Sequence, residues 1–363
     1  MTSSTPRVLM IAPNDPAGAA INLLKALRHH VEPVRARLVT VTRRYDFRFA
    51  RDIYVPDVCR VPDCDRAVLG PPTRGCVGCT RPAQIGLDRY DEIRDLIRAA
   101  DVIHFHILAD EELHVGPLRV GDHVRPSTEL VHHHHGHPDF RANPAKYRTK
   151  YALTGRRTLV STPDLLHLLP DAVWIPNSVP IDEPLLKPIH GERVFSPVVV
   201  SHSPTRRDLK NTDELLAAVA RLATRGVPIR VELLENLRHV ECLERKRHSD
   251  VSFDHLQGYF GMSSLEALAQ GITTIAGIDA WNERAIRDFF GCDSLPWVVV
   301  RDVAALEPTL ERLATDPAER AERGAASRRF LETVWTERRI AAALVDFYEA
   351  RAGATAAPRV AHG

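Results

Sequence analysis

Short apolar runs alternate along the first half of the chain with longer segments in which apolar residues recur every three or four positions. Such runs are typical of strands buried on both faces of a parallel sheet, and the segments 18–28 and 90–100 are typical of amphipathic helices. This alternation predicts a doubly wound α/β domain. The predicted strands are Arg7–Ala12, Arg37–Val41, Val102–Phe105, Glu129–His133 and Thr158–Ser161.

The alternation restarts after a proline-rich stretch, which predicts a hinge at Pro184–Pro197 and a second α/β domain. We expect domains at 1–185 and 186–340, then a helix end and disordered tail at 341–363. The predicted elements of the second domain are strands Val198–Ser201, Ile229–Leu234, Val251–Phe253, Ile272–Ala276 and Trp297–Val300, and helices Asp213–Thr224 and Ser263–Gln270.

The composition agrees with a globular protein of two domains, since the chain has 363 residues, 44% of them hydrophobic and 26% charged. Its 48 basic and 47 acidic residues leave a formal net charge of +1, which argues against a general nucleic-acid binder. The sequence contains neither a signal-peptide pattern nor an apolar stretch of the roughly 18 residues that a membrane span needs. The expected location is the cytoplasm.

A basic turn, HSPTRRDLK, follows the first predicted strand of the second domain. Its cations Arg206, Arg207 and Lys210 precede an amphipathic helix. Backbone N–H groups at a helix start, together with such cations, suit a diphosphate. A solvated basic turn is the alternative.

A second loop of the same domain, GYFGMSSLEALAQG, combines glycines with a helical glutamate. Gly258 and Gly261 let a ligand approach the backbone, and Glu266 can accept hydrogen bonds from a diol such as ribose. Met262 and Ser263, at the helix start, join the nucleotide-binding candidates, although Met262 also suits a core position. Glu266 can instead be a solvated carboxylate on the helix surface.

A run of four histidines, 132–135, ends a predicted strand of the first domain. Because side chains alternate along a strand, even-numbered and odd-numbered members face opposite sides of the sheet, which disfavours a metal site built from neighbours. Two facing α/β sheets place a ligand cleft at the carboxyl ends of their strands. We expect His135, followed by Gly136, to face this cleft and to stabilise developing negative charge. His104 and His106 either line the same cleft or are buried and hydrogen-bonded.

The loop after the first strand, PNDPAG, precedes a predicted helix. Asn14 and Gly18 are candidates for contacting a ligand phosphate or for leaving space for a second substrate. Asp15 can simply cap the helix.

Four segments occur in the order known from one protein family. They are WIPNSVPID, HSPTRRDLKNT, GYFGMSSLEALAQGITTIAG and DPAERAERGAASRRFLETVW, and they resemble the family 4 retaining glycosyltransferases of the two-Rossmann GT-B fold. In the first half, RVLMIAPNDPAGAAINLLKAL, DVIHFH and ELVHHHHGHPDFR are more loosely similar. The resemblance implies transfer of a sugar from a nucleotide-diphosphate donor, with retention of the anomeric configuration and without a catalytic metal.

Carried onto this sequence, the resemblance assigns the donor diphosphate to Lys210 and to Arg206 or Arg207, with Arg206 favoured. It assigns the ribose hydroxyls to Glu266 and a place near the donor sugar to His135.

The sequence departs from the family at two positions. The first glutamate of the E-x7-E motif, which contacts the donor sugar in the family, is replaced by Gly258, and Asp254 can restore part of the lost polarity. Asn211 stands in place of a glycine, and asparagine tolerates left-handed backbone angles better than most residues.

Four of the six cysteines lie in an insertion near 56–82 that the resemblance does not explain. Their spacing, C-x4-C-x11-C-x2-C, in a cytoplasmic chain favours one structural Zn²⁺ over disulfides. Free or redox-active thiols and an iron–sulfur cluster are the alternatives. The candidate ligands are Cys59, Cys64, Cys76 and Cys79.

The sequence thus predicts a hexosyltransferase-like glycosyltransferase that uses a nucleotide-sugar donor and no cofactor for catalysis. The acceptor is not identified. A non-catalytic nucleotide-sugar-binding protein and a GT-B sugar-nucleotide epimerase are the alternatives, because the motif lacks its first glutamate.

Overall fold

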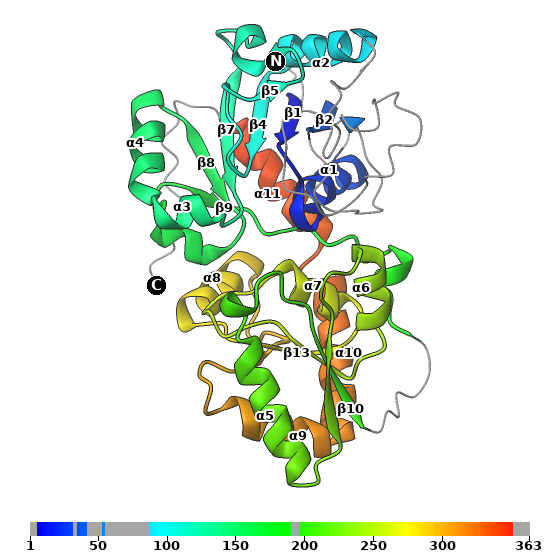
Figure 1. The fold of residues 1–363 in the computed structure, drawn as a ribbon. Helices are drawn as coiled ribbons and strands as arrows, with labels where there is room; N and C mark the ends of the chain where they lie inside the picture. Colours follow the sequence, from blue (N-terminus) through cyan, green and yellow to red (C-terminus); the bar gives the residue numbers. More distant parts are fainter. Residues whose placement is uncertain (1–5, 32–34, 42–52, 55–86, 190–196, 351–363) are drawn as a thin grey trace.

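The computed structural model describes residues 6–31, 35–41, 53–54, 87–189 and 197–350. Its first domain contains a seven-stranded parallel sheet in the order β3-β2-β1-β4-β7-β8-β9 (Figure 1). Two β-α units that run outward from β1 in opposite directions make this order doubly wound. The strands are β1 (Arg7–Ala12), β2 (Arg35–Thr40), β3 (Ile53–Tyr54), β4 (Val102–His106), β7 (Glu129–His134), β8 (Arg157–Val160) and β9 (Val173–Trp174).

Helices cover both faces of this sheet. Alternate residues of β1 enter different apolar clusters: Val8 and Met10 pack with α1 (Ala19–His30) and α11 (Glu337–Glu349), whereas Leu9 packs with α2 (Leu87–Ala99). A short hairpin, β5 (His114–Val115) and β6 (Leu118–Arg119), and two helices, α3 (Pro138–Ala142) and α4 (Pro144–Thr154), complete the domain.

The second domain repeats the design with a five-stranded parallel sheet in the order β11-β10-β12-β13-β14. Helices α5 (Thr212–Thr224) and α9 (Leu306–Thr315) cover one face, while α7 (Met262–Ala269) and α10 (Pro317–Thr333) pack together and against β13. Helices α6 (His239–Lys246) and α8 (Ala280–Phe290) flank the sheet. The strands are β10 (Val198–His202), β11 (Ile229–Leu233), β12 (Val251–Phe253), β13 (Thr273–Ala276) and β14 (Val298–Val299).

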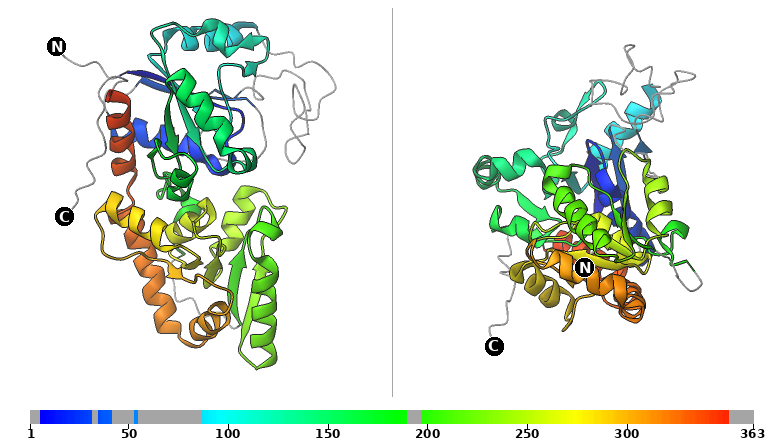
Figure 2. Two further views of the ribbon diagram at one scale, coloured as in Figure 1. Left: turned by 90° about the vertical axis from the view of Figure 1, so that its left-hand side faces the viewer. Right: turned by 60° about the horizontal axis from the view of Figure 1, so that its bottom comes forward.

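The last helix joins the two domains. After α10 runs along the second domain, α11 returns to the first and packs against α1 (Figure 2). The Arg157 guanidinium lies 4.1 Å from the centroid of the Phe347 ring, which fixes α11 to β8. Between the domains, buried Trp335 stacks on Phe290 at 4.5 Å, and one apolar cluster continues through both domains.

Candidate functional site

The two loops that the sequence singles out in the second domain meet at the carboxyl ends of β10 and β12. Ser203 and Ser263 are joined by a 2.6 Å hydrogen bond between their hydroxyls. The Asn211 side-chain oxygen accepts a hydrogen bond from the Leu256 backbone N–H at 2.9 Å. Asn211 has a φ of +53°, so this asparagine adopts the left-handed conformation that replacement of a glycine requires.

Lys210 contacts a buried carboxylate at this junction. Its ammonium donates to Asp254 Oδ1 at 3.3 Å, and Asp254 Oδ2 accepts from the Gly261 N–H at 2.6 Å. Burial by itself would raise the pKa of Asp254, but His255, Lys210 and the Gly261 N–H hold that pKa well below its usual range. A Cβ at Gly261 would lie 3.2 Å from Asp254 Oδ1 and 3.4 Å from Lys210 Nζ, so a glycine lets the backbone approach this ion pair.

Glu266 lies in a buried ion-paired cluster, one turn into helix α7, which begins directly after Gly261. It accepts hydrogen bonds from Lys246 Nζ at 2.9 Å and from His239 Nε2 at 2.6 Å. Lys246, only 1% exposed, also donates to the Ser263 hydroxyl at 2.9 Å. Burial raises the pKa of Glu266, but the charges of Lys246 and His239 outweigh it and lower the pKa to about 2. Glu266 is therefore an ionised acceptor.

Arg206 and Arg207 are exposed and form ion pairs of their own. Arg206 donates to Asp208 at 3.1 Å, and Arg207 donates to Glu235 at 2.7 Å. Of the three cations of the basic turn, Lys210 is the one that contacts the buried carboxylate.

Gly258, where the family has a glutamate, has a φ of +88°. Its carbonyl accepts hydrogen bonds from the Asn282 amide at 3.0 Å and the Asp279 N–H at 2.8 Å. A Cβ at Gly258 would lie 3.1 Å from Asp279 Oδ2. The carboxylate of Asp279, which caps the N-terminus of α8, therefore lies beside the position of the missing glutamate side chain.

The first domain contributes an arginine to the same region. The Arg141 guanidinium lies 4.6 Å from the centroid of the Tyr259 ring, in the second domain, and forms a 2.8 Å ion pair with Asp164. The Asp164 N–H donates to the Asn282 side chain at 3.1 Å. No motif or spacing indicated Arg141 or Asp164, because only the packing of the two domains brings them to Tyr259.

His135 follows β7 at the carboxyl edge of the first sheet. Its Nε2 lies 3.0 Å from His106 Nδ1, and burial lowers its pKa to about 4, so the imidazole is neutral near pH 7. The predicted alternation of the histidine run is confirmed: His132 and His134 pack on Tyr151, whereas His133 and His135 stack on each other.

In the first loop, Asp15 caps α1. Its carboxylate accepts hydrogen bonds from the N–H groups of Ala20 at 2.8 Å and Ile21 at 3.0 Å, and burial raises its pKa to about 6. Gly18 is left-handed, with a φ of +64°. The roles of Asn14 and Gly18 in ligand binding stay predictions, as do those of Met262 and Ser263.

The four clustered cysteines Cys59, Cys64, Cys76 and Cys79 lie outside the described residues. Within the described part of the chain, Cys242 and Cys292 are free thiols.

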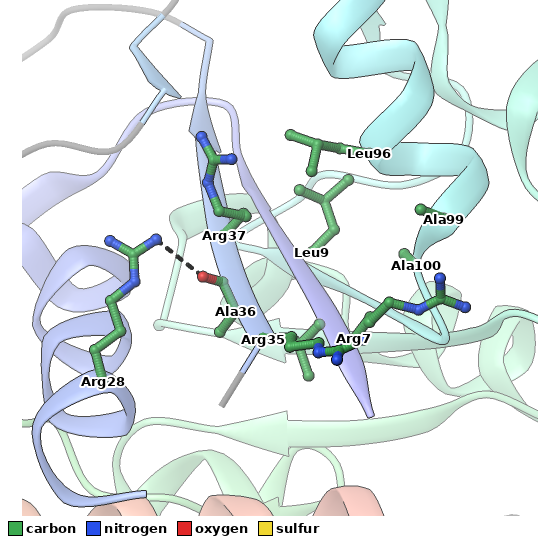
Figure 3. A pocket seen from close by; sticks show the side chains of 10 residues that line it. Arg7, Leu9, Arg28, Arg35, Ala36, Arg37, Leu96, Ala99 and Ala100 are labelled. Carbon is green, nitrogen blue, oxygen red and sulfur yellow. Dashed lines mark hydrogen bonds between the residues drawn. The ribbon is translucent and has the colours of Figure 1, made fainter. Parts of the chain in front are cut away.

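A cavity of about 350 Å³ lies at the other end of the first sheet, where β1 and β2 begin (Figure 3). Arg7 pairs with Asp101 at 3.0 Å, and Arg37 pairs with Glu92 at 3.3 Å. The cavity is therefore separate from the site at the carboxyl ends of the strands. Its arginines are Arg7, Arg28, Arg35 and Arg37.

Two parallel Rossmann-like sheets in succession, with a final helix that returns to the first domain, define the GT-B fold. The structure is similar to that of Anabaena HepE in complex with UDP and glucose, with a TM-score of 0.59, 12% identity, and coverage of 95% of this chain and 100% of that one. Sucrose-phosphate synthase from Thermosynechococcus elongatus gives a TM-score of 0.57 and 14% identity, over 94% of this chain and 98% of that one.

A third solved structure, S. aureus TarM in complex with UDP and other ligands, has a TM-score of 0.50 and 13% identity, over 68% of this chain. The chain spans about half of TarM, since 55% of TarM is covered. No protein-family model matches the sequence, and no curated protein matches it either. Among the helices of the described residues, none combines the length and the apolarity that crossing a membrane requires.

Proposed function

We propose that the protein is a glycosyltransferase that moves a hexose from a nucleoside-diphosphate donor to an acceptor, with retention and without a catalytic metal. The observation that carries the proposal is the meeting of two loops at Lys210, Asp254, Gly261 and Glu266. The solved structures with the same fold include HepE bound to UDP and glucose. Those likenesses support the fold, and the chemistry of the site supports the reaction.

In this proposal the diphosphate binds at Lys210 and at the start of α7, where Met262 and Ser263 offer backbone N–H groups. Gly261, whose N–H is bonded to Asp254, lets the diphosphate approach the backbone closely. Arg206 exchanges its contact with Asp208 for the phosphate, and Arg207 is the alternative. An exposed arginine pair costs little to break. These groups stabilise the charge that develops on the leaving diphosphate, which is the role a divalent metal plays in other enzymes.

Glu266 binds the ribose in this proposal. An ionised carboxylate offers about four acceptor positions, and His239 and Lys246 use two of them. The buried cluster holds Glu266 charged and in one orientation, so the remaining positions are available to a diol. His135, neutral and oriented by His106, forms a hydrogen bond with the donor sugar or with the leaving phosphate. Asn14 and Gly18 lie next to the acceptor.

The proposal is tested without knowledge of the acceptor, because glycosyltransferases can release the donor sugar slowly to water. Purified protein is incubated with UDP-, GDP- and TDP-hexoses, and NMR identifies the anomer released before it equilibrates. We expect hydrolysis of one donor, unaffected by EDTA, with the α-anomer formed from an α-linked donor. Release of the β-anomer would contradict retention, and formation of an altered sugar nucleotide would identify an epimerase.

A non-catalytic nucleotide-sugar-binding protein is the second candidate, and Gly258 favours it, because the sugar-contacting glutamate of the family is absent. Asp279, beside Gly258, is the carboxylate that we propose replaces it. Binding of a donor by calorimetry with no turnover of any donor, with or without sugar acceptors, would support this candidate.

We also propose that the four clustered cysteines bind one structural Zn²⁺. The metal should be released by mercurial reagents that titrate thiols. Four freely titrating thiols in a protein without this zinc would contradict the proposal.

A further inference from the structure

Three histidines of two neighbouring strands, His104 and His106 of β4 and His133 of β7, share one face of the first sheet, the face that α1 and α11 cover. Because β4 and β7 are parallel and in register at His106 and His133, the rings of these two strands lie over one another. His104 stacks on His106 at 4.3 Å and on His133 at 5.2 Å between centroids. One ring nitrogen from each of these three residues lies within 4.8 Å of the other two.

The three rings are buried, yet several of their nitrogens have no partner. His104 bonds to the Tyr348 hydroxyl through Nδ1 at 2.6 Å, and His106 bonds to His135 through Nδ1 at 3.0 Å. The Nε2 atoms of both residues, and both nitrogens of His133, make no hydrogen bond with described residues. Buried polar atoms almost always have a partner, so a group that binds these nitrogens is indicated.

We propose that His104, His106 and His133 bind one divalent transition-metal ion of the zinc type. Neutral imidazole is a preferred ligand of such ions, and three imidazoles with one open position form a familiar zinc site. Burial lowers the pKa of His104 to about 3 and holds those of His106 and His133 well below their usual range, so all three rings are in the neutral, ligating form near pH 7.

The hydrogen bonds around the rings match those of metal-binding histidines. Such a histidine commonly binds the ion through one nitrogen and gives its other N–H to a fixed partner, which sets the tautomer and the orientation of the ring. Tyr348 is this partner for Nδ1 of His104, and His135 is this partner for Nδ1 of His106. The Nε2 atoms of both histidines are then available to the ion.

Binding of one ion requires the three rings to move together and to turn. Zn–N bonds of about 2.0–2.1 Å in a tetrahedral site place two nitrogens about 3.3 Å apart, whereas the three nitrogens now lie within 4.8 Å. The ring planes lie at 17° between His104 and each of the other two rings and at 33° between His106 and His133, so side-chain rotation has to shorten these distances and turn the lone pairs toward one ion. The bound ion would link β4, β7 and, through Tyr348, the last helix of the chain.

The test compares the full-length wild type with two matched variants, His133→Phe and His132→Phe. These neighbours lie on the same strand, and His132 faces the opposite side of the sheet. Each protein is stripped of metal, reloaded with Zn²⁺, freed of excess ion and analysed for zinc per chain. We expect His133→Phe to bind one equivalent less than the wild type and His132→Phe to bind as much as the wild type. Equal zinc in all three proteins would overturn the proposal.

A second measurement uses the wild type alone and separates this site from the cysteine cluster. In Co²⁺-loaded protein, imidazole ligation gives strongly shifted, exchangeable N–H proton signals in NMR spectra, whereas thiolate ligation does not. We expect such signals from the His104 and His106 rings. Their absence in Co²⁺-saturated protein would overturn the proposal, even if His133→Phe did not fold.

Discussion

In the second domain, the buried carboxylate of Glu266 is ionised and pairs with Lys246 and His239, whereas in the first domain the buried rings of His104, His106 and His133 are neutral and leave nitrogens without partners. The histidines lie on strands β4 and β7, whereas Glu266 lies on helix α7. The cluster around Glu266 stabilises charge through pairing. The histidine cluster avoids charge, because burial lowers the pKa of each ring.

This difference shows that the buried polar groups of the two domains carry different chemistry. A paired carboxylate keeps a fixed hydrogen-bond acceptor ready for a polar ligand. Neutral imidazoles with free nitrogens are suited instead to a cation that forms direct bonds. The two clusters should therefore respond differently to acid and to substitution.

The largest expected effect is that of acid on the metal-free first domain. The folded-state pKa of His104 is about 3, below the value near 6.5 of an unfolded histidine, so its contribution is complete above pH 6.5 and is lost as the pH falls. Each such histidine removes up to about 1.4 kcal/mol of stability per pH unit. The contribution of Glu266 is lost only below pH 4.3 or so, as the pH approaches its folded pKa of about 2.

Hydrogen exchange at pH 7 and pH 5, corrected for intrinsic rates, checks this order. Protection of β4 and β7 should fall more than that of β12 and β13. Burial lowers the pKa of six histidines on or beside β4 and β7, whereas beside β12 it lowers the pKa of two, His202 and His255, each to about 4. Equal loss in both sheets would show that the histidines do not set the acid response.

Breaking the ion pair of the second domain should have the next largest effect. Lys246→Met leaves Glu266 buried without its main partner and should cost about 3 to 5 kcal/mol of unfolding free energy. The double variant with Glu266→Gln should recover part of this loss, because no buried charge remains. Arg221→Met, at an exposed ion pair with Glu307, is the control and should have no measurable effect. Denaturation in urea measures all four proteins, and an equally small effect of Lys246→Met would contradict the pairing.

Lys210→Ala should weaken binding of the nucleoside diphosphate by about 1.5 to 3 kcal/mol, the range for a charge-assisted hydrogen bond. Calorimetry with UDP and the other nucleoside diphosphates measures the change. Lys187→Ala, outside both loops, is the control and should bind normally. An unchanged affinity in Lys210→Ala would remove this lysine from the site.

The smallest effect should come from the backbone at Gly258. Gly258→Ala forces a Cβ onto a left-handed residue, at a cost of about 1 to 2 kcal/mol, and places it 3.1 Å from Asp279. Gly226→Ala has similar strain, with a φ of +82°, but its Cβ would meet nothing within 4 Å. Thermal unfolding should show the larger loss for Gly258→Ala. Equal losses would mean that Asp279 moves away freely.

Much of the fold could be predicted because parallel strands buried on both faces are continuous apolar runs. The bounds predicted for β1 and β12 agree with the structure, and the basic and glycine-rich loops join at the place expected from their strands. Helix α6 was not predicted, because it is short and its buried members include Lys246, a residue type that usually marks the surface. The partners of Glu266 were missed for that reason.

The sequence alone determined which histidines of the run 132–135 share a face of the sheet, since alternation of side chains is a local property of an extended backbone. It also determined that Asn211 could take a left-handed conformation, which depends on the residue type. Only the tertiary structure decided that β4 lies beside β7 with His106 opposite His133, and that Tyr348 reaches His104 from the far end of the chain. Strand order and helix return depend on packing between distant segments, and no local pattern of residues specifies which segments those are.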